Sequence, residues 1–468
     1  MGVSLSASLA VLAIGQSVAA PLPAEMWLGI YLQGQKVGFS RYRSEAQPDG
    51  STARLSQTVI QSKMLGDSLT LKADSYTIST PQGLISTRFE MESAGRTMVV
   101  TASFNSREVR AGMTTNGTTQ RKTIPIPAGK VLTDDPSTEL LLGLTHFQKE
   151  KVFTVFAPDI LSLVDVTVRR KAPAPFQPLK GSQVMATEIE IADPRATTRL
   201  FVSAKGDLIQ AVGPFGMALI PEPESVARVI DGGPVDLADV SALRPDKPLK
   251  EGAKLTILEI SGTDLSRIPT GCQQVVERRG TESDPSWHLT VGPMIGGNQN
   301  TRIEEAAKQQ PDWVKPDDRV PSTDQDMVRR AREIVGNEQR VIPAAHRLRR
   351  WVHRQMGVAA GIGVMRDAKE ILQSQEGVCR DHAILLGTLT KAAGIPTRFV
   401  NGIIYFDGVF LYHAWVEVWD GERWIGMDST RPDDRLTSLH IKTSQGTVAQ
   451  AMTGFLLEGA RIRVIRQD

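Results

Sequence analysis

A cysteine stands at the predicted start of a helix. Residues 376–383 read Glu-Gly-Val-Cys-Arg-Asp-His-Ala, and the apolar residues that follow predict a helix from about Asp381 to Gly394, beyond which Pro396 prevents continuation. Cys379 therefore lies at or just before the helix N-terminus. Unpaired backbone N–H groups and the positive end of the helix dipole favour the thiolate at such a position. Because the thiolate is the nucleophilic form of cysteine, this placement suits covalent catalysis.

A predicted β-hairpin downstream supplies a base and a carboxylate. Residues 413–419 alternate like a strand, Asp420-Gly421 is a strong two-residue turn signal, and residues 422–430 form the return strand. If this dipeptide forms the centre of the turn, His413 faces Asp428. Residues opposed in this way have Cβ atoms about 4.5–5.5 Å apart, within reach of an imidazole–carboxylate hydrogen bond. The same register gathers apolar side chains on the other face: Ala414, Val416, Val418, Ile425 and Met427.

Four short motifs surround these residues in the sequence. They are Gly377-Val378-Cys379 with Ala383, the run from Ala393 to Arg398, the run from His413 to Val418, and the run from Trp424 to Asp428 with Thr430. In this order, over about Pro321 to Asp434, they resemble the transglutaminase-like superfamily. The resemblance implies a papain-like fold with Cys379 as nucleophile, His413 as base and Asp428 as orienting acid. Ser429 and His382 depart from the family, which often has a proline and an aromatic residue at these positions.

The resemblance implies acyl transfer that needs no cofactor. The Cys379 thiolate attacks a peptide or carboxamide carbonyl to give a thioester, while His413 takes and returns the proton and Asp428 fixes its tautomer. The Cys379 backbone N–H is expected to bind the oxyanion. Trp415 and Trp424 are candidate substrate-binding residues, with shielding of the site as the alternative. Water as the acceptor gives a protease or amidase and an amine gives a transglutaminase, and the residues favour neither.

Three other interpretations stay open. Zinc could bind Cys379, His382, His413 and Asp428. Cys272 could form a disulfide with Cys379. The chain could also be a non-catalytic exported binding or assembly protein that keeps a relic domain. The joint placement of sulfur, imidazole and carboxylate favours the enzyme over all three.

Composition and the N-terminus give limits on partners and location. The formal net charge of +2 provides no electrostatic case for a nucleic-acid partner. The first 24 residues carry no charged side chain, and residues 1–20 resemble a signal peptide, although no basic residue precedes the apolar run. We therefore expect an exported protein, periplasmic or extracellular, without an integral membrane domain in the mature chain; an N-terminal membrane tether is the alternative. The expected partner is a peptide or protein substrate, with cell-wall peptide as one candidate.

The remaining sequence predicts an α+β protein, in which a papain-like transglutaminase core at the C-terminus follows a large, mostly antiparallel β domain. The expected segments are an antiparallel β domain at 26–220, a proline-rich linker at 221–250, a small β segment at 251–300, a catalytic domain at 321–440 and a C-terminal β extension at 441–468. In the first domain we expect a hairpin at 27–40, strands at 68–78, 86–91, 97–104, 187–191 and 198–203, and a short helix at 137–148.

Helical periodicity begins after Pro321. Ser322-Thr323 with Asp326 predicts a capped helix start, a second helix begins near Pro343, and a third occupies about 367–374, ahead of the nucleophile loop. The second helix is basic, and we expect this side to be a solvated surface, with docking of an acidic substrate as the alternative. Its basic residues are His346, Arg347, Arg349, Arg350, His353 and Arg354.

Overall fold

The described chain forms two compact units. The computed structural model describes residues 25–64, 66–115, 117–133, 150–193, 195–233, 235–271, 273–281, 284–292, 297–317, 319–358, 364–434, 436–452 and 457–468. The boundary between the units falls between Val240 and Ser241, and Val364 belongs with the N-terminal unit. The expected helix at 137–148 and Cys272 lie outside the described residues.

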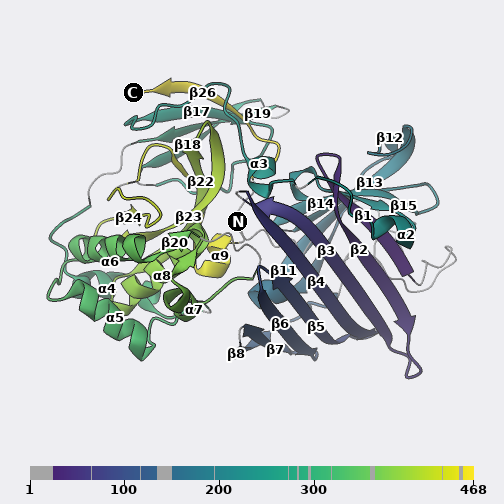
Figure 1. The fold of residues 1–468 in the computed structure, drawn as a ribbon, viewed down its shortest axis with the longest axis horizontal. Helices are drawn as coiled ribbons and strands as arrows, with labels where there is room; N and C mark the ends of the chain where they lie inside the picture. The colour runs from purple at the N-terminus through teal and green to yellow at the C-terminus, as the bar shows by residue number, and fades with distance from the viewer. Residues whose placement is uncertain are drawn as a thin grey trace. The chain divides into compact units, whose positions relative to one another are not determined.

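The N-terminal unit is built on one large curved sheet (Figure 1). Its strands follow the order β8-β7-β6-β5-β4-β3-β2-β1-β16-β15-β14-β13-β11-β10-β9, with β12 paired to β13, and all these pairs are antiparallel except β9 with β10. The strands are β1 (Glu25–Leu32), β2 (Gln35–Ala46), β3 (Thr52–Met64), β4 (Asp67–Thr80), β5 (Gly83–Ser93), β6 (Arg96–Phe104), β7 (Glu108–Thr115), β8 (Thr118–Pro125), β9 (Leu132–Thr133), β10 (Glu150–Ala157), β11 (Ser162–Arg170), β12 (Ala174–Phe176), β13 (Val184–Asp193), β14 (Ala196–Val202), β15 (Leu208–Val212) and β16 (Ala218–Pro221). Two short helices follow: α2 (Glu224–Ala227) and α3 (Leu237–Ser241).

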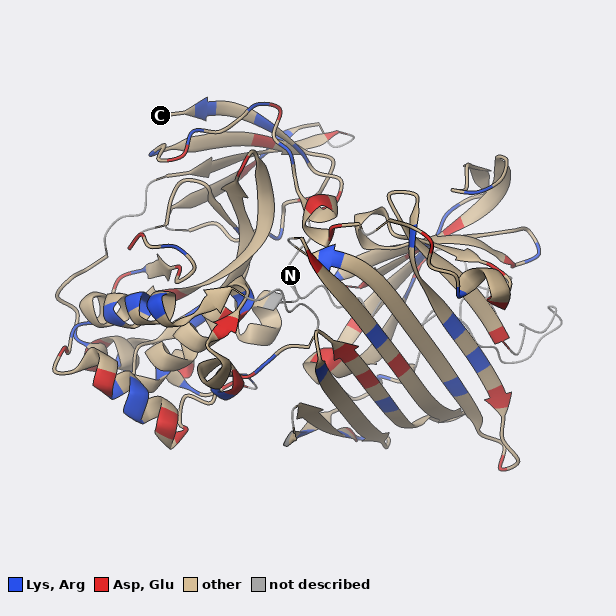
Figure 2. Cartoon of the chain, in the orientation of Figure 1, with Lys and Arg blue, Asp and Glu red and all other residues tan. Residues whose placement is uncertain are grey.

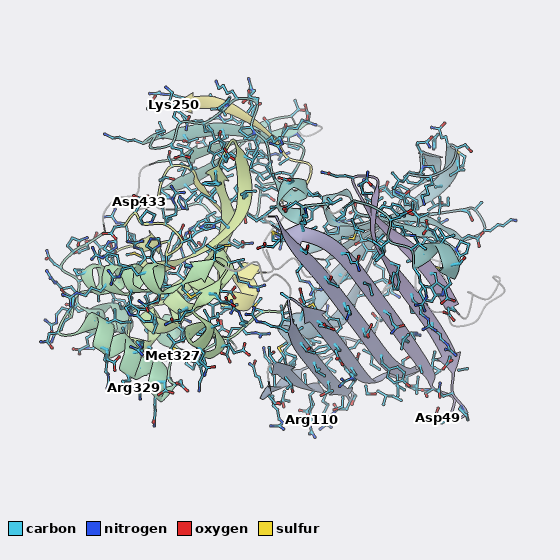
Figure 3. The ribbon with its side chains drawn as sticks, viewed as in Figure 1. Asp49, Arg110, Lys250, Met327, Arg329 and Asp433 are labelled. Atoms are coloured by element: carbon cyan, nitrogen blue, oxygen red, sulfur yellow. The ribbon has the colours of Figure 1, made fainter. Side chains whose placement is uncertain are left out.

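This sheet forms its core by folding back on itself. Buried residues alternate with more exposed ones along strands such as β4 and β7, as expected for an antiparallel sheet with one solvated face. Leu132 of β9 lies in one apolar cluster with Phe89 of β5 and Val100 of β6, so the two ends of the sheet pack together. The turns are set by short polar residues; Asp49, between β2 and β3, accepts the Ser51 N–H at 2.9 Å (Figure 3).

The C-terminal unit contains the helices and two further four-stranded sheets. Its elements are β17 (Thr256–Ser261), β18 (Gln274–Gly280), β19 (Pro285–Val291), α4 (Ile303–Gln309), α5 (Gln325–Val335), α6 (Val341–Gln355), β20 (Gly357–Val358), α7 (Ala368–Ser374), β21 (Glu376–Gly377), α8 (Cys379–Ala392), β22 (Thr397–Phe406), β23 (Val409–Trp419), β24 (Trp424–Met427), β25 (His440–Gly446), α9 (Val448–Met452) and β26 (Arg461–Gln467). The sheet β24-β23-β22-β25 packs against α8, and the other sheet has the order β18-β19-β17-β26. A short pair, β20 with β21, leads into the first residue of α8.

The helices bury one face and expose the other. On α5, Met327 is buried in the core while Arg329 is exposed and bonded to Asp326 at 2.6 Å (Figure 3). Asp324 caps this helix through the Asp326 and Met327 N–H groups, so the cap expected at Ser322-Thr323 is wrong by one to two residues. The helix of the nucleophile begins at Cys379, two residues before the predicted start.

The hairpin that carries the histidine also differs from its prediction. Trp419 pairs with Trp424 and Val416 with Met427, so residues 420–423 form a four-residue loop in place of the predicted two-residue turn. Asp420 holds this loop by accepting the N–H groups of residues 422 and 423 at 2.9 and 2.8 Å. The register moves by two residues. Because side chains alternate with a period of two, every side chain keeps its predicted face.

Candidate active site

Cys379 occupies the first turn of α8; its thiol is free and the residue is partly buried. The carboxylate of Asp381 accepts the Val378 N–H at 3.0 Å and closes the helix start. Cys379 is the first helical residue, so its backbone N–H has no acceptor inside the helix and lies at the positive end of the helix dipole. The helix therefore presents a thiol together with a backbone donor.

A buried ion pair holds the loop in front of the nucleophile. The Arg366 guanidinium lies 2.9 Å from Asp381 and donates to the Glu376 carbonyl at 2.7 Å. Burial alone would raise the pKa of Asp381, but the charges of Arg380 and Arg366 hold it below its ordinary value. Gly377 lies so close that an added Cβ would stand 2.6 Å from both members of the pair. Glycine is required at this position because any side chain would clash with the Arg366–Asp381 ion pair.

The Cys379 thiol lies beside the imidazole of His413, and each group shifts the pKa of the other. Burial works against ionisation of the thiol, yet the contact with His413 and the Ala414 N–H hold the pKa of Cys379 below its usual range. Burial would likewise lower the pKa of His413, but the Asp428 carboxylate and the Cys379 sulfur raise it. Both directions favour a thiolate–imidazolium pair.

Asp428 completes this arrangement from the segment after β24. Its Oδ2 lies 2.8 Å from His413 Nε2, which leaves the other ring nitrogen for the thiol. Its Oδ1 accepts the Thr430 N–H at 2.8 Å and the Thr430 hydroxyl at 2.7 Å. Burial would raise the pKa of Asp428, but the charge and hydrogen bond of His413, together with the contact from His440, hold it well below its ordinary value. The structure thus brings the predicted sulfur, imidazole and carboxylate together in that order.

His440 is a further member of the cluster that the sequence did not single out. It is the first residue of β25, its side chain is 1% exposed, and its Nε2 lies 3.3 Å from Asp428 Oδ2. No motif or spacing marks it, because β25 reaches the site only through its pairing with β22.

His413, Asp428 and His440 lie close enough together to hold a metal ion. Their hydrogen bonds favour protons instead. The Thr437 N–H donates to His440 Nδ1 at 3.1 Å, so Nε2 carries the proton and has no lone pair for a metal. With its Nε2 protonated, His440 cannot complete a metal site with His413 and Asp428. The zinc set considered from the sequence also included His382, whose buried Nδ1 has no hydrogen-bond partner among the described residues.

The two tryptophans have different neighbours. Trp415 is 2% exposed and its ring stacks at 6.0 Å on His413 and meets His440 edge-on at 5.6 Å, which fits the shielding role. Trp424 shares the face of His413, and its ring contacts include Trp313 and Trp419, each at 5.5 Å, and the Arg398 guanidinium at 4.3 Å. Trp415 therefore packs directly against His413.

Arg349 of α6 positions the segment that carries Asp428. Its side chain is fully buried and donates to the carbonyls of residues 428, 431 and 432 and to the Asp434 carboxylate. The expectation that the whole basic side of this helix is solvated is therefore wrong at Arg349. His353 also faces inward, with Nδ1 3.0 Å from the Ser429 carbonyl. Figure 2 shows the basic residues along α6 and the mixed charges of α5.

Known proteins give a family for this region. Residues 328–429 match the sequence model of the Transglutaminase-like superfamily. Uncharacterized protein ML0607 of Mycobacterium leprae is 30% identical over 106 residues, which is 21% of this chain and 37% of that protein. Uncharacterized protein Rv2569c of Mycobacterium tuberculosis is 30% identical over 91 residues, 16% of this chain and 29% of that protein. The chain thus spans less than two fifths of the length of either relative.

Among solved structures, "a Putative Cysteine Protease from Cytophaga hutchinsonii" is similar with a TM-score of 0.32 and 16% sequence identity. The match covers 46% of this chain and 86% of that one. Among the described residues, none of the helices has both the length and the apolar character that crossing a membrane requires.

Proposed function

We propose, from a transglutaminase-like core domain at residues 328–429, that the chain catalyses cysteine-dependent acyl transfer on a peptide or carboxamide bond. The observation that carries the proposal is the arrangement of Cys379 beside His413 and of His413 Nε2 at 2.8 Å from the Asp428 carboxylate. Cys379 is only partly buried, whereas His413 and Asp428 are buried, so we place the approach of the substrate carbonyl on the side of Cys379.

In the first step the Cys379 thiolate attacks the carbonyl carbon and a carbon–sulfur bond forms. The oxyanion accepts a hydrogen bond from the Cys379 N–H at the start of α8. The His413 imidazolium gives its proton to the leaving nitrogen, the carbon–nitrogen bond breaks, and a thioester and a free amine remain. Asp428 keeps the His413 ring in the orientation that points one nitrogen at sulfur.

In the second step an acceptor attacks the thioester. His413 takes the acceptor's proton, the carbon–sulfur bond breaks, and the thiolate returns. Water as acceptor releases a carboxylic acid, and a primary amine gives a new amide. The same triad serves both outcomes, so the acceptor decides whether the enzyme is a hydrolase or a transamidase.

We also propose that the chain acts outside the cytoplasm on a peptide or protein, cell-wall peptide included. Residues 1–20 support export through their apolar, uncharged sequence and small residues before Pro21. Expression of the full-length chain with fractionation and N-terminal sequencing tests this. Cleavage near Ala19 or Ala20 is the expected result, and full-length protein in the cytoplasm contradicts export.

The catalytic proposal is tested with wild type and Cys379→Ala on a panel of glutamine peptides, other peptides and peptidoglycan fragments, each with and without a fluorescent amine. Mass spectrometry separates free acid from amine conjugate. Turnover by wild type and none by the variant supports the proposal. A Cys379 thiol that iodoacetamide labels no faster than a model thiol at pH 6 supports the alternative, a non-catalytic binding or assembly protein.

A further inference from the structure

We propose that His440 is a positioning residue that shares the Asp428 carboxylate with His413 and thereby limits how tightly His413 holds its proton. This inference rests on the proposed function for its catalytic meaning. Its physical content, a second donor on one carboxylate oxygen, is independent of any substrate.

The two imidazoles meet at the same oxygen. His413 Nε2 lies 2.8 Å and His440 Nε2 3.3 Å from Asp428 Oδ2, while Oδ1 is occupied by Thr430. Two donors on one oxygen compete, so each weakens the bond that the other makes. The carboxylate is consequently less basic toward His413 than it would be with one imidazole.

The backbone just before β25 fixes the tautomer of His440. The Thr437 N–H donates to Nδ1 at 3.1 Å, and the His440 N–H returns to the Thr437 carbonyl at 3.2 Å. A backbone N–H can only donate, so Nδ1 is the acceptor and Nε2 bears the hydrogen that points at Asp428. Burial lowers the pKa of His440, which keeps this ring neutral.

A glycine makes the convergence of these rings possible. Gly402 of β22 pairs with His413 on one side and with Lys442 of β25 on the other. An added Cβ there would lie 2.7 Å from the Trp415 ring and 2.1 Å from the Ile441 carbonyl oxygen. The missing side chain lets Trp415 lie over the strand between the two histidines, edge-on to His440.

Other charged or titratable groups face this pair from the surrounding elements. From α8 come Cys379 and His382, from α6 come Arg349 and His353, and Arg431 follows β24. Arg349 and His353 direct hydrogen bonds at the backbone carbonyls of residues 428 and 429. Among the described side chains, the hydrogen bonds to Oδ2 come from the two imidazoles, so His440 is the group whose replacement changes the acceptor strength of Asp428 toward His413.

The test titrates the histidine rings directly. Full-length protein with ¹⁵N-labelled histidine contains seven such rings, which are assigned by single substitution. In a Cys379→Ala background, ring spectra against pH give the midpoint of His413 for the parent and for His440→Asn and His440→Gln. Glutamine places its amide N–H where histidine has Nε2, whereas asparagine is too short to reach Asp428.

We expect the parent to show His440 as the neutral Nε2–H tautomer at pH 7. We expect His440→Asn to raise the His413 midpoint by about one pH unit, the size of one hydrogen bond to a charged group, and His440→Gln to restore the parent value. An Nδ1–H tautomer overturns the inference. So does an unchanged midpoint in His440→Asn, or an equal shift in both variants, which would indicate packing alone.

Enzyme turnover provides a second test of the role of His440. In the protein with Cys379 intact, His440→Asn should slow proton return to the leaving nitrogen while leaving iodoacetamide labelling near neutral pH unchanged, and His440→Gln should restore the turnover. If wild type shows no turnover on any substrate, the proposed function fails while the ring titration still decides the inference.

Discussion

Arg349 reaches the carboxylate of Asp434 at 2.6 Å from a side chain that has no exposure to solvent. The same guanidinium donates to three carbonyls between residues 428 and 432. Helix α6 therefore fixes the segment that presents the Asp428 carboxylate, although that segment is far from the helix in the sequence.

Replacement of Arg349 should both destabilise the C-terminal unit and weaken the site. Arg349→Leu removes buried donors from several carbonyls, and we expect a loss of about 3 kcal/mol, the usual scale when one member of a buried charged network is removed. Urea unfolding measures it. Arg350→Leu is the matched control, because Arg350 is half-exposed and 3.4 Å from the same carboxylate, and should change stability by less than about 0.5 kcal/mol. Equal losses in both variants would contradict the assigned role of Arg349.

Asp428→Asn should lower the reactivity of Cys379 without unfolding the chain. The neutral amide cannot stabilise the His413 imidazolium and favours the wrong tautomer, so the thiolate loses its partner. We expect turnover to fall by about 10³–10⁴-fold, as when the acid of a triad is replaced by its amide. Asp433→Asn, an exposed neighbour on the same segment (Figure 3), is the control and should keep wild-type rates. Retained turnover in Asp428→Asn argues against the triad.

The pH dependence of alkylation should show the ion pair. The pKa of Cys379 is lowered and that of His413 is raised, so thiolate and imidazolium coexist between the two values. Wild type should therefore react with iodoacetamide well below about pH 8.5, the ordinary pKa of cysteine, and faster than His413→Ala. The difference in labelling rate between wild type and His413→Ala should narrow once the pH exceeds the ordinary pKa of cysteine, because the thiol is then ionised in both proteins. Parallel profiles for the two proteins would show that His413 does not act on the sulfur.

Gly402→Ala should be among the most disruptive small substitutions in the C-terminal unit. The added methyl group would meet a backbone oxygen at 2.1 Å, and neither β22 nor β25 can move away without breaking their ladder. We expect a loss of about 3 kcal/mol, the upper part of the range for overpacking. Gly112→Ala, in a strand of the other unit with its nearest contact at 3.7 Å, should cost less than about 1 kcal/mol. Thermal unfolding of both variants checks the contrast.

Much of the catalytic core follows from local patterns. The apolar run and Gly394 define α8 because helix formation and its termination depend on residues within one or two turns. The alternation in 413–419 places His413 on one face and its apolar neighbours on the other, and this assignment holds although the predicted register was wrong. A slip of two residues preserves faces, whereas a slip of one would have reversed them.

The turn itself was decided by tertiary contacts. Asp420-Gly421 is a strong local signal, yet the Asp420 carboxylate also accepts the N–H of Asn298 at 2.7 Å, more than a hundred residues away in the sequence. That partly buried bond adds to the two that Asp420 makes inside the loop, and together they stabilise the four-residue loop. His413 therefore reaches Asp428 diagonally, through a side chain long enough for the offset.

By itself, the sequence determined the residue types, a helix start within two residues of the cysteine and the faces of the strands, because these depend on neighbours along the chain. Only the tertiary structure placed His440 beside Asp428, buried Arg349 and joined β26 to β17. Those contacts join segments that are not neighbours in the sequence, so no periodic pattern along the chain predicts them. The energy that fixes them comes from desolvated hydrogen bonds and strand pairing that exist only after the chain has folded.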